Sequence, residues 1–454
     1  MKKAYLFLSA TFLLSGCITD SLGDYKLDLS PASWSAKESA DVKSVAPSEL
    51  AFWWKRFNDP ALDKLVARGL NESPDRLIAE ARILEARGLR RTSRSALFPQ
   101  IGASASAGRE DTKTSSIYPD NFYDAQFDAS YEVDIFGQNR KGFSASDSNL
   151  KAAEEQYKDV TLTLVAEITR NYIDYRAAQN QLRIARKNLV SQEQTLQLIQ
   201  DLHRLGSAPR LDVERASNLV STTRASLPEY KRQAENARLR LTVLTGILPE
   251  DLAPIIAEDA DIPGIHIEPI LLTPAQTLAQ RPDVRAAAQT LAANTSLAEA
   301  ETASLFPTFT LSGFYGIADN AVINSAAPWN IAVGAAVSLI DFGRIEGRID
   351  AARAREKQAY EQYRKTVLTA VTDVETALID YSHIKEQYES LRNAYISAET
   401  SLELSKALYK EGEISFLDVL DAQRTANDAE AAMVSATAAQ SESITRLFKS
   451  LGVY

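Results

Sequence analysis

The chain has 454 residues, of which 60 are acidic and 50 basic, and its formal net charge at pH 7 is −10. This acidic balance argues against a nucleic-acid partner, because phosphate backbones are bound through basic patches. Three scattered histidines, one cysteine and no phosphate-binding glycine loop favour neither a metal or cofactor site nor an enzyme.

The first 16 residues are typical of a lipoprotein signal peptide. Two lysines precede the apolar run 4–14, and Leu14-Ser15-Gly16-Cys17 resembles a bacterial lipobox, which implies cleavage before Cys17 and acylation of that residue. The alternative is a signal peptide with an incidental cysteine. Ile18 follows Cys17 where an aspartate would favour the inner membrane, so we expect an anchor in the bacterial outer membrane. Past the signal, no apolar run approaches the roughly 20 residues of a membrane helix, so any crossing must use strands.

Residues 17–96 are expected to form a lipid-anchored arm followed by the first short helices. Pro60 lies in the first turn of one predicted helix, capped by Asp59, and a second helix runs from Asp75 to about Ser95. The aromatic block at 52–57 is compatible with either an interface or a small packed core.

A period-2 pattern marks the second of four predicted strands. From Tyr123 to Ile135 the odd positions are apolar or aromatic and the even positions are polar. Such alternation is typical of a strand with one apolar and one polar face. Similar stretches predict strands over 98–108, 306–317 and 329–339, the third being less regular. The strands form a first hairpin within 97–136 and a second within 305–342.

Helical periodicity follows each hairpin. Apolar residues recur at gaps of three and four after Gly137, and we expect a rod from Phe143 to Leu205 of roughly 95 Å. Gly206 and Gly412 end the two rods, and shorter helices return over 211–245 and 416–451. Pro209 is expected in the first turn of the first returning helix. The first long helical hairpin thus occupies 137–246 and the second 343–454, with a proline-rich linker and short helices over 247–304.

The chain is an internal duplication. Adding 206 to a residue number carries Gly137 onto Gly343 and Gly206 onto Gly412, while Leu-Phe-Pro at 97–99 recurs at 305–307, offset by 208. Four strands cannot close a membrane barrel, whose smallest known forms have about eight, yet an open edge cannot be left in lipid. The barrel must therefore be shared between chains, and a dimer, trimer or tetramer would each satisfy this requirement.

Several motifs together resemble the TolC-type outer-membrane efflux factors, specifically their lipoprotein (NodT-like) branch. They are Cys17 in its lipobox, Trp53-Trp54 with Asp59-Pro60, Val133 to Gly137, Gln280 to Val284 with Leu305 to Pro307, and Tyr409 to Ala422. The resemblance implies an α+β membrane protein: a homotrimer with a twelve-stranded β-barrel in the outer membrane, continued by a twelve-helix periplasmic α-barrel. It implies a passive exit duct for drugs or other small molecules. Its partners would be a periplasmic adaptor and an inner-membrane pump of the resistance-nodulation-division type.

Two other functions remain open at this stage. The duct could serve type I protein secretion, or the chain could be a non-conducting coiled-coil lipoprotein that acts as a spacer. The spacer explains the rods and the anchor but not four amphipathic strands.

The turns at the ends of the rods are candidate docking sites for the adaptor. The residues concerned are Gly206, Ser207, Gly412, Glu413 and Ser415. Simple helix reversal is the alternative role, because the two glycines would serve it equally well.

Asp418 and Asp421 match, under the resemblance, paired aspartates that ring the periplasmic gate. Their spacing of three places them on one face of the returning helix. Asp418 could instead complete a capping box with Ser415, whereas Asp421 lies too far along for capping and replaces Arg215 of the first half. Three copies would surround the opening with six carboxylates that attract cations.

Overall fold

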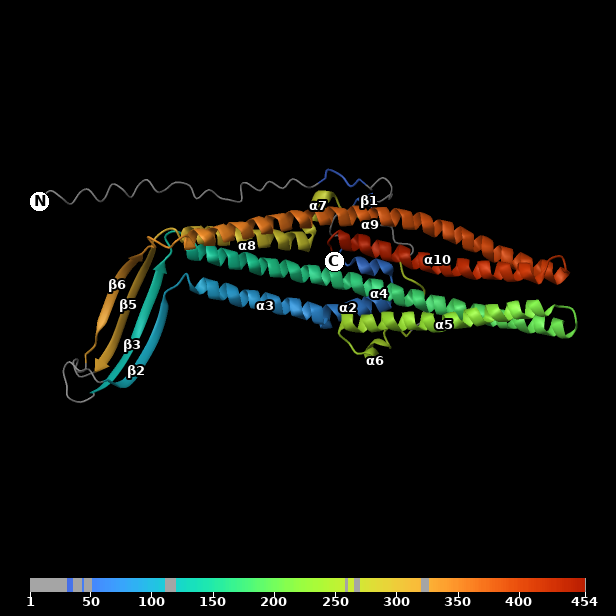
Figure 1. Cartoon of the computed structure of the whole chain (residues 1–454), viewed down its shortest axis with the longest axis horizontal. Helices are drawn as coiled ribbons and strands as arrows, with labels where there is room; N and C mark the ends of the chain where they lie inside the picture. Colours follow the sequence, from blue (N-terminus) through green and yellow to red (C-terminus); the bar gives the residue numbers. More distant parts are fainter. Residues whose placement is uncertain are drawn as a thin grey trace. The chain divides into compact units, whose positions relative to one another are not determined.

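The computed structural model describes residues 31–35, 43–44, 51–110, 120–257, 260–264, 270–319 and 326–453, so the predicted signal and Cys17 lie outside it (Figure 1). The described chain forms two compact units. The strand unit comprises residues 89–149 and 289–364, and the helix unit comprises 30–88, 150–288 and 365–453.

The strand unit holds one four-stranded sheet. Its strands are β2 (Gln100–Glu110), β3 (Asp120–Val133), β5 (Thr308–Asp319) and β6 (Trp329–Ala336), in the order β2-β3-β5-β6 with every pair antiparallel. All four predicted strands are confirmed, with ends that differ from the predicted ones by up to three residues. The ladder that fixes those ends involves residues far apart in sequence, which the local pattern does not contain.

The register places all odd-numbered positions of the sheet on one face. Phe127 lies opposite Ala103 on β2 and Tyr315 on β5, and Tyr315 lies opposite Trp329 on β6. This face is apolar, and its large side chains are exposed in the single chain. The other face is polar and includes Asp124 and Asp128. β5 pairs in the same register, but its alternation is less regular, because Phe314 lies on the polar face and Gly313 on the apolar one.

Ten helical segments complete the described chain. The long ones are α3 (Pro74–Ser95), α4 (Gln138–Arg204), α5 (Arg210–Thr245), α8 (Pro282–Ala303), α9 (Arg344–Glu411) and α10 (Phe416–Ser450). The short ones are η3 (Trp53–Phe57), α2 (Pro60–Glu72), α6 (Pro249–Leu252) and α7 (Pro274–Gln280). A two-residue pair joins β1 (Lys43–Ser44) in parallel to β4 (Ile270–Leu271). Among the described helices, none combines the length and apolar character needed to span a bilayer.

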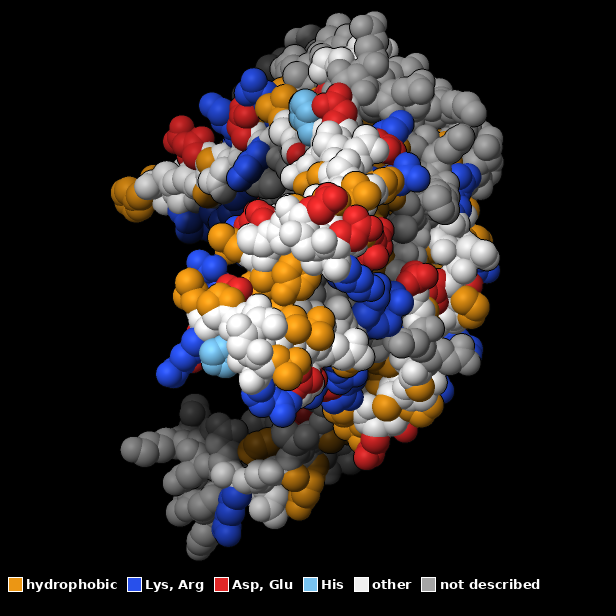
Figure 2. Space-filling view, turned by 90° about the vertical axis from the view of Figure 1, so that its right-hand side faces the viewer, with side chains coloured by type: hydrophobic (Ala, Val, Ile, Leu, Met, Phe, Trp, Pro, Cys, Tyr) orange, Lys and Arg blue, Asp and Glu red, His pale blue; other side chains and the backbone are white. Residues whose placement is uncertain are grey.

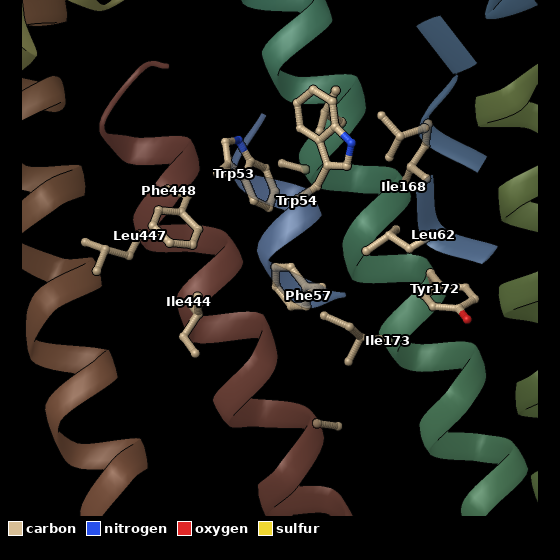
Figure 3. Packing of buried hydrophobic residues seen from close by; sticks show 14 of the residues in the cluster. Trp53, Trp54, Phe57, Leu62, Ile168, Tyr172, Ile173, Ile444, Leu447 and Phe448 are labelled. Atoms are coloured by element: carbon tan, nitrogen blue, oxygen red, sulfur yellow. The ribbon is translucent and has the colours of Figure 1, made fainter. Parts of the chain in front are cut away.

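The aromatic block forms a packed core in the helix unit (Figure 3). Trp53 is fully buried, and its ring centroid lies 5.5 Å from that of Phe448 on α10. Asp59 caps α2 as predicted, accepting from the backbone N–H groups of Ala61 and Leu62. Its second oxygen accepts a 2.8 Å hydrogen bond from the Tyr172 hydroxyl on α4. The block therefore joins the start of α2 to both long hairpins.

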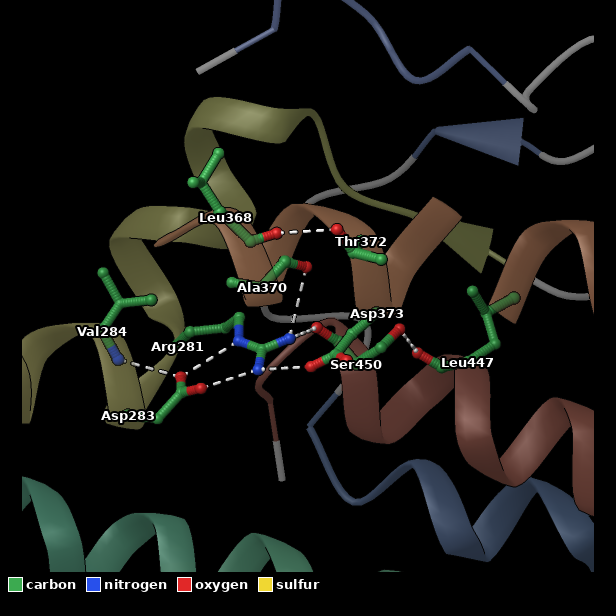
Figure 4. A network of polar contacts seen from close by, with 9 residues as sticks. All are labelled: Arg281, Asp283, Val284, Leu368, Ala370, Thr372, Asp373, Leu447 and Ser450. Carbon is green, nitrogen blue, oxygen red and sulfur yellow. Dashed lines mark hydrogen bonds and ion pairs between the residues drawn. The ribbon is translucent and has the colours of Figure 1, made fainter. Parts of the chain in front are cut away.

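A buried arginine ties the linker to the second hairpin (Figure 4). The Arg281 guanidinium makes ion pairs of 2.7 Å with Asp283 and 2.9 Å with Asp373 on α9. It also donates a 3.0 Å hydrogen bond to the Ser450 carbonyl at the end of α10. Gly452 is packed so closely that a Cβ there would lie 2.8 Å from the Arg281 Cα. A buried charge needs such multiple partners, because its desolvation is costly.

Candidate functional site

Each long hairpin reverses through the same hydrogen-bonded turn. Gly206 and Gly412 have φ of 76° and 78°, a conformation that glycine adopts without strain. Beyond them, the Ser207 N–H donates to the Leu202 carbonyl and the Glu413 N–H to the Leu408 carbonyl, at 2.8 and 3.0 Å. This pattern is a Schellman motif, so both predicted helix stops are confirmed. We name residues 205–209 and 411–415 the tip turns.

One expectation about the first tip turn was wrong in detail. Pro209 lies one residue before α5, at the N-cap position, and not within the first turn of the helix. Its extended backbone, with ψ of 151°, explains the difference, because the helical conformation begins only at Arg210.

A small apolar cluster holds the two tip turns together in the helix unit. Ile199 on α4 and Phe416 on α10 are buried in it with Ala208, and Ile414 is partly buried against them. The Tyr409 and Phe416 rings lie 5.5 Å apart. The outermost residues stay exposed, including Leu205, Ser207 and Glu413. Figure 2, which faces the side where these turns lie in Figure 1, shows hydrophobic side chains interspersed with acidic and basic ones.

Asp418 completes the cap of α10. One carboxylate oxygen accepts hydrogen bonds from the Ser415 backbone N–H and hydroxyl, at 3.0 and 2.7 Å. These bonds lower the pKa of Asp418, because they favour its charged form. The capping role that the sequence left open is therefore present in the structure, and it engages a carboxylate that we also considered for the gate.

Asp421 has a different partner. Its carboxylate forms an exposed 2.8 Å ion pair with Arg424, one turn further along α10. Both residues line a groove of about 410 Å³ between α5 and α10, together with Glu214 and Arg215. Our sequence reasoning missed Arg424, although its spacing of three from Asp421 is a known signal of helical ion pairs.

Within the described ranges, no three histidine, cysteine or acidic side chains lie close enough together to hold a metal ion. The candidate functional features are therefore the tip turns and the first turns of α10 in the helix unit and, separately, the two-faced sheet of the strand unit.

A family model for outer membrane efflux proteins matches residues 65–247 and 273–453. The chain belongs to this family. The pyoverdine export outer membrane protein OpmQ of Pseudomonas aeruginosa is 30% identical to it, over 99% of this chain and 96% of OpmQ. The toluene efflux pump outer membrane protein TtgF of Pseudomonas putida is 31% identical, over 100% of this chain and 97% of TtgF. The solved structure of the outer-membrane channel OprN matches with a TM-score of 0.87 at 32% identity, covering 95% of this chain and 98% of OprN.

These findings confirm the resemblance drawn from the sequence. The chain has the fold of outer-membrane channel proteins and is an outer-membrane channel component of an efflux system. The family is one of transport ducts.

The α10 cap gives a first prediction. Ser415→Ala removes one of the two donors to Asp418, so we expect faster amide exchange over 416–422 in hydrogen-exchange mass spectrometry at neutral pH. Because folding lowers the pKa of Asp418, the cap contributes its full stability above the ordinary carboxyl pKa of about 4 and loses it as the pH falls through the lowered pKa. Ser207→Ala, in the other tip turn, is the matched control and should leave α10 unchanged. Equal exchange in both variants would contradict the cap.

Proposed function

We propose that three copies of this chain close into a twelve-stranded barrel in the outer membrane, continued by a twelve-helix barrel in the periplasm. The two-faced sheet carries this proposal: its odd face is apolar and exposed, as a lipid-facing surface requires. β2 and β6 are the edges of the described sheet, and an edge cannot remain unpaired in lipid. The strands alternate in direction, so β6 of one copy meets β2 of the next in antiparallel orientation.

Acylation at Cys17 anchors each copy in this proposal. The resemblance of residues 14–17 to a lipobox supports this anchor. The proposed chain has seven segments, which are the signal, the arm, two β-hairpins, two helical hairpins and the linker.

The assembled duct is passive. An inner-membrane pump of the resistance-nodulation-division type and a periplasmic adaptor supply the energy and the cargo, which is a drug or another small molecule. The relatives support a permissive duct, because OpmQ is named for pyoverdine export and TtgF for toluene efflux. Pyoverdine and toluene are different compounds, so in this proposal the selection of cargo belongs to the other components.

The orientation of the sheet can be tested with two neighbouring positions. Phe127→Arg places a charge on the apolar face and should cost about 2–4 kcal/mol near mid-membrane. Asp128→Arg changes the polar face and should be tolerated. The measurement is the yield of heat-resistant oligomer in isolated outer membranes. Equal yields of the two variants would show that the faces are assigned wrongly.

Adaptor docking is assigned to the tip turns in this proposal. Ser207 and Glu413 are exposed there, at the outer side of the apolar cluster. Ser207→Lys with Glu413→Lys should abolish export of a pump substrate from whole cells while oligomer yield is unchanged. Glu386→Lys, also exposed but on α9, is the matched control and should keep export. Loss of the oligomer together with export would assign these residues to folding instead.

The gate is assigned to Asp418 and Asp421, with Asp421 carrying the larger part because the α10 cap already engages Asp418. In planar bilayers, Asp421→Ala should lower the cation selectivity of the channel and weaken its block by multivalent cations several-fold. The proposal of a duct also requires that the wild-type chain conducts ions in the same bilayers. If selectivity and block are unchanged in the Asp418→Ala, Asp421→Ala double variant, the gate lies elsewhere.

A further inference from the structure

The internal duplication extends to the register of the sheet. Gln100 on β2 lies opposite Ser130 on β3. The repeat offset is 208 for β2 and 206 for β3, so Gln100 corresponds to Thr308 and Ser130 to Ala336. Thr308 and Ala336 also lie opposite each other, on β5 and β6. At the other end, Ala107 and Tyr123 become Tyr315 and Trp329 in the same way, and these two are also paired. The two hairpins are thus copies of each other down to the residue.

The junction between the hairpins has its own register. β3 of the first half pairs with β5 of the second, with Phe127 opposite Tyr315 and Val133 opposite Phe309. Just beyond the last pair, the rings of Phe136 and Phe306 stack with centroids 4.5 Å apart and planes at 17°. In a closed ring, an equivalent junction forms between copies. There β6, from the second half of one copy, takes the place of β3, and β2, from the first half of the next copy, takes the place of β5. The same offsets therefore give the register of the junction between copies.

Applying the two offsets to these junction residues selects four exposed apolar side chains of the strand unit. Phe136 and Phe306 map onto Phe342 and Phe98, which are 99% and 53% exposed. Val133 and Phe309 map onto Leu339 and Ile101, which are 89% and 76% exposed. Each is an apolar group that the single chain leaves largely in contact with solvent. Their exposure is what a missing neighbour would produce.

The backbone supports the same conclusion. Phe342 has a φ of 53°, a conformation that bulky residues rarely adopt, whereas Phe136 does not have a positive φ. β6 also ends at Ala336, although β3 continues to Val133, the counterpart of Leu339. The end of β3, which has its partner in β5, is thus regular. The end of β6, which has no partner on its outer side in the single chain, is shorter and is followed by a strained backbone at Phe342.

We propose that Phe342 of each copy stacks on Phe98 of the next copy, with β6 paired to β2 so that Val333 lies opposite Ala107. This aromatic clasp rests on the proposed assembly and deepens it, because it specifies the register and the residues that close the ring. The partner copy extends β6 to Leu339, which then lies opposite Ile101. Arg94 lies 5.8 Å from the Phe98 ring centroid, and Phe342 takes the other face of that ring.

One difference between the halves lies within the clasp. Asp134 caps α4 through the N–H groups of Asn139 and Arg140, whereas the corresponding position in the second half is Ile340. Asp341 caps α9 from the next position, through the N–H groups of Gly343 and Ile345. The cap is retained with a shift of one residue, so the phenylalanine keeps its place before the glycine.

The register is tested by disulfide cross-linking of the full-length chain in outer membranes. Val333→Cys with Ala107→Cys should give covalent oligomers on oxidation, at least five times more than two matched controls. The controls pair Val333→Cys with Ala105→Cys or with Arg109→Cys, the neighbouring positions of β2 on the same face. A disulfide within one chain is excluded, because β3 and β5 separate the two edges by about 14 Å and a disulfide needs Cα atoms within about 7 Å. The parent chain with Cys17 alone provides the baseline.

The outcomes separate this inference from the proposed assembly. Strongest cross-linking with Ala105→Cys or Arg109→Cys, in an intact oligomer, would overturn the register and leave the assembly standing. Absence of any oligomer in the wild-type chain would overturn both.

The clasp itself is tested by a double-mutant cycle on oligomer dissociation temperature. Phe342→Ala and Phe98→Ala should each lower that temperature, and the double variant should lower it no further than the larger single effect. Leu205→Ala, at a leucine of a tip turn that is 79% exposed, is the control and should have no effect. Additive losses would show that the two rings do not meet.

Discussion

The proposed assembly depends on one constraint: backbone N–H and C=O groups that enter lipid need partners, and a four-stranded sheet leaves two rows of them without any. β2 and β6 are those rows in the described sheet. The apolar odd face adds a second demand, because it is stable only against lipid or protein. Neither demand can be met by one chain in water. The helix unit, by contrast, contains its own core around Trp53. A single copy therefore buries the apolar side chains of that core but leaves the apolar face of the sheet exposed.

The features that could be predicted from the sequence are those with a local cause. The period-2 pattern at 123–135 located β3, and the glycines at 206 and 412 located both tip turns, because alternation and positive φ are properties of short segments. Strand ends were less accurate, since they depend on the distant strand that pairs with them. The two roles of Asp418 could not be separated, because a spacing of three from Ser415 suits a cap as well as a shared helix face. Asp373 and Ser450, two of the partners of Arg281, come from segments far along the chain, and no pattern in the sequence joins them to it.

Duplication explains why the two halves share a backbone but not their chemistry. The tip turns have the same hydrogen bonds, yet Pro209 stands where the second half has the capping residue Ser415, and Arg215 stands where it has Asp421. A repeated scaffold lets side chains diverge without loss of the fold, since its turns are specified by glycine and backbone bonds. The two hairpins therefore carry different charges near their tip turns, and in the proposed ring of three copies the two kinds would alternate.

The contact between Arg281 and Ser450 also constrains the order in which the protein can be made. A chain exported from its N-terminus delivers Arg281 well before α10, so the Ser450 carbonyl is the last partner of that guanidinium to arrive. Packing of Arg281 against Gly452 follows at the same late stage. The core of the second hairpin is thus completed only when nearly all of the chain has left the inner membrane. A chain interrupted in α10 would lack the Ser450 carbonyl and would leave this buried charge with one partner fewer.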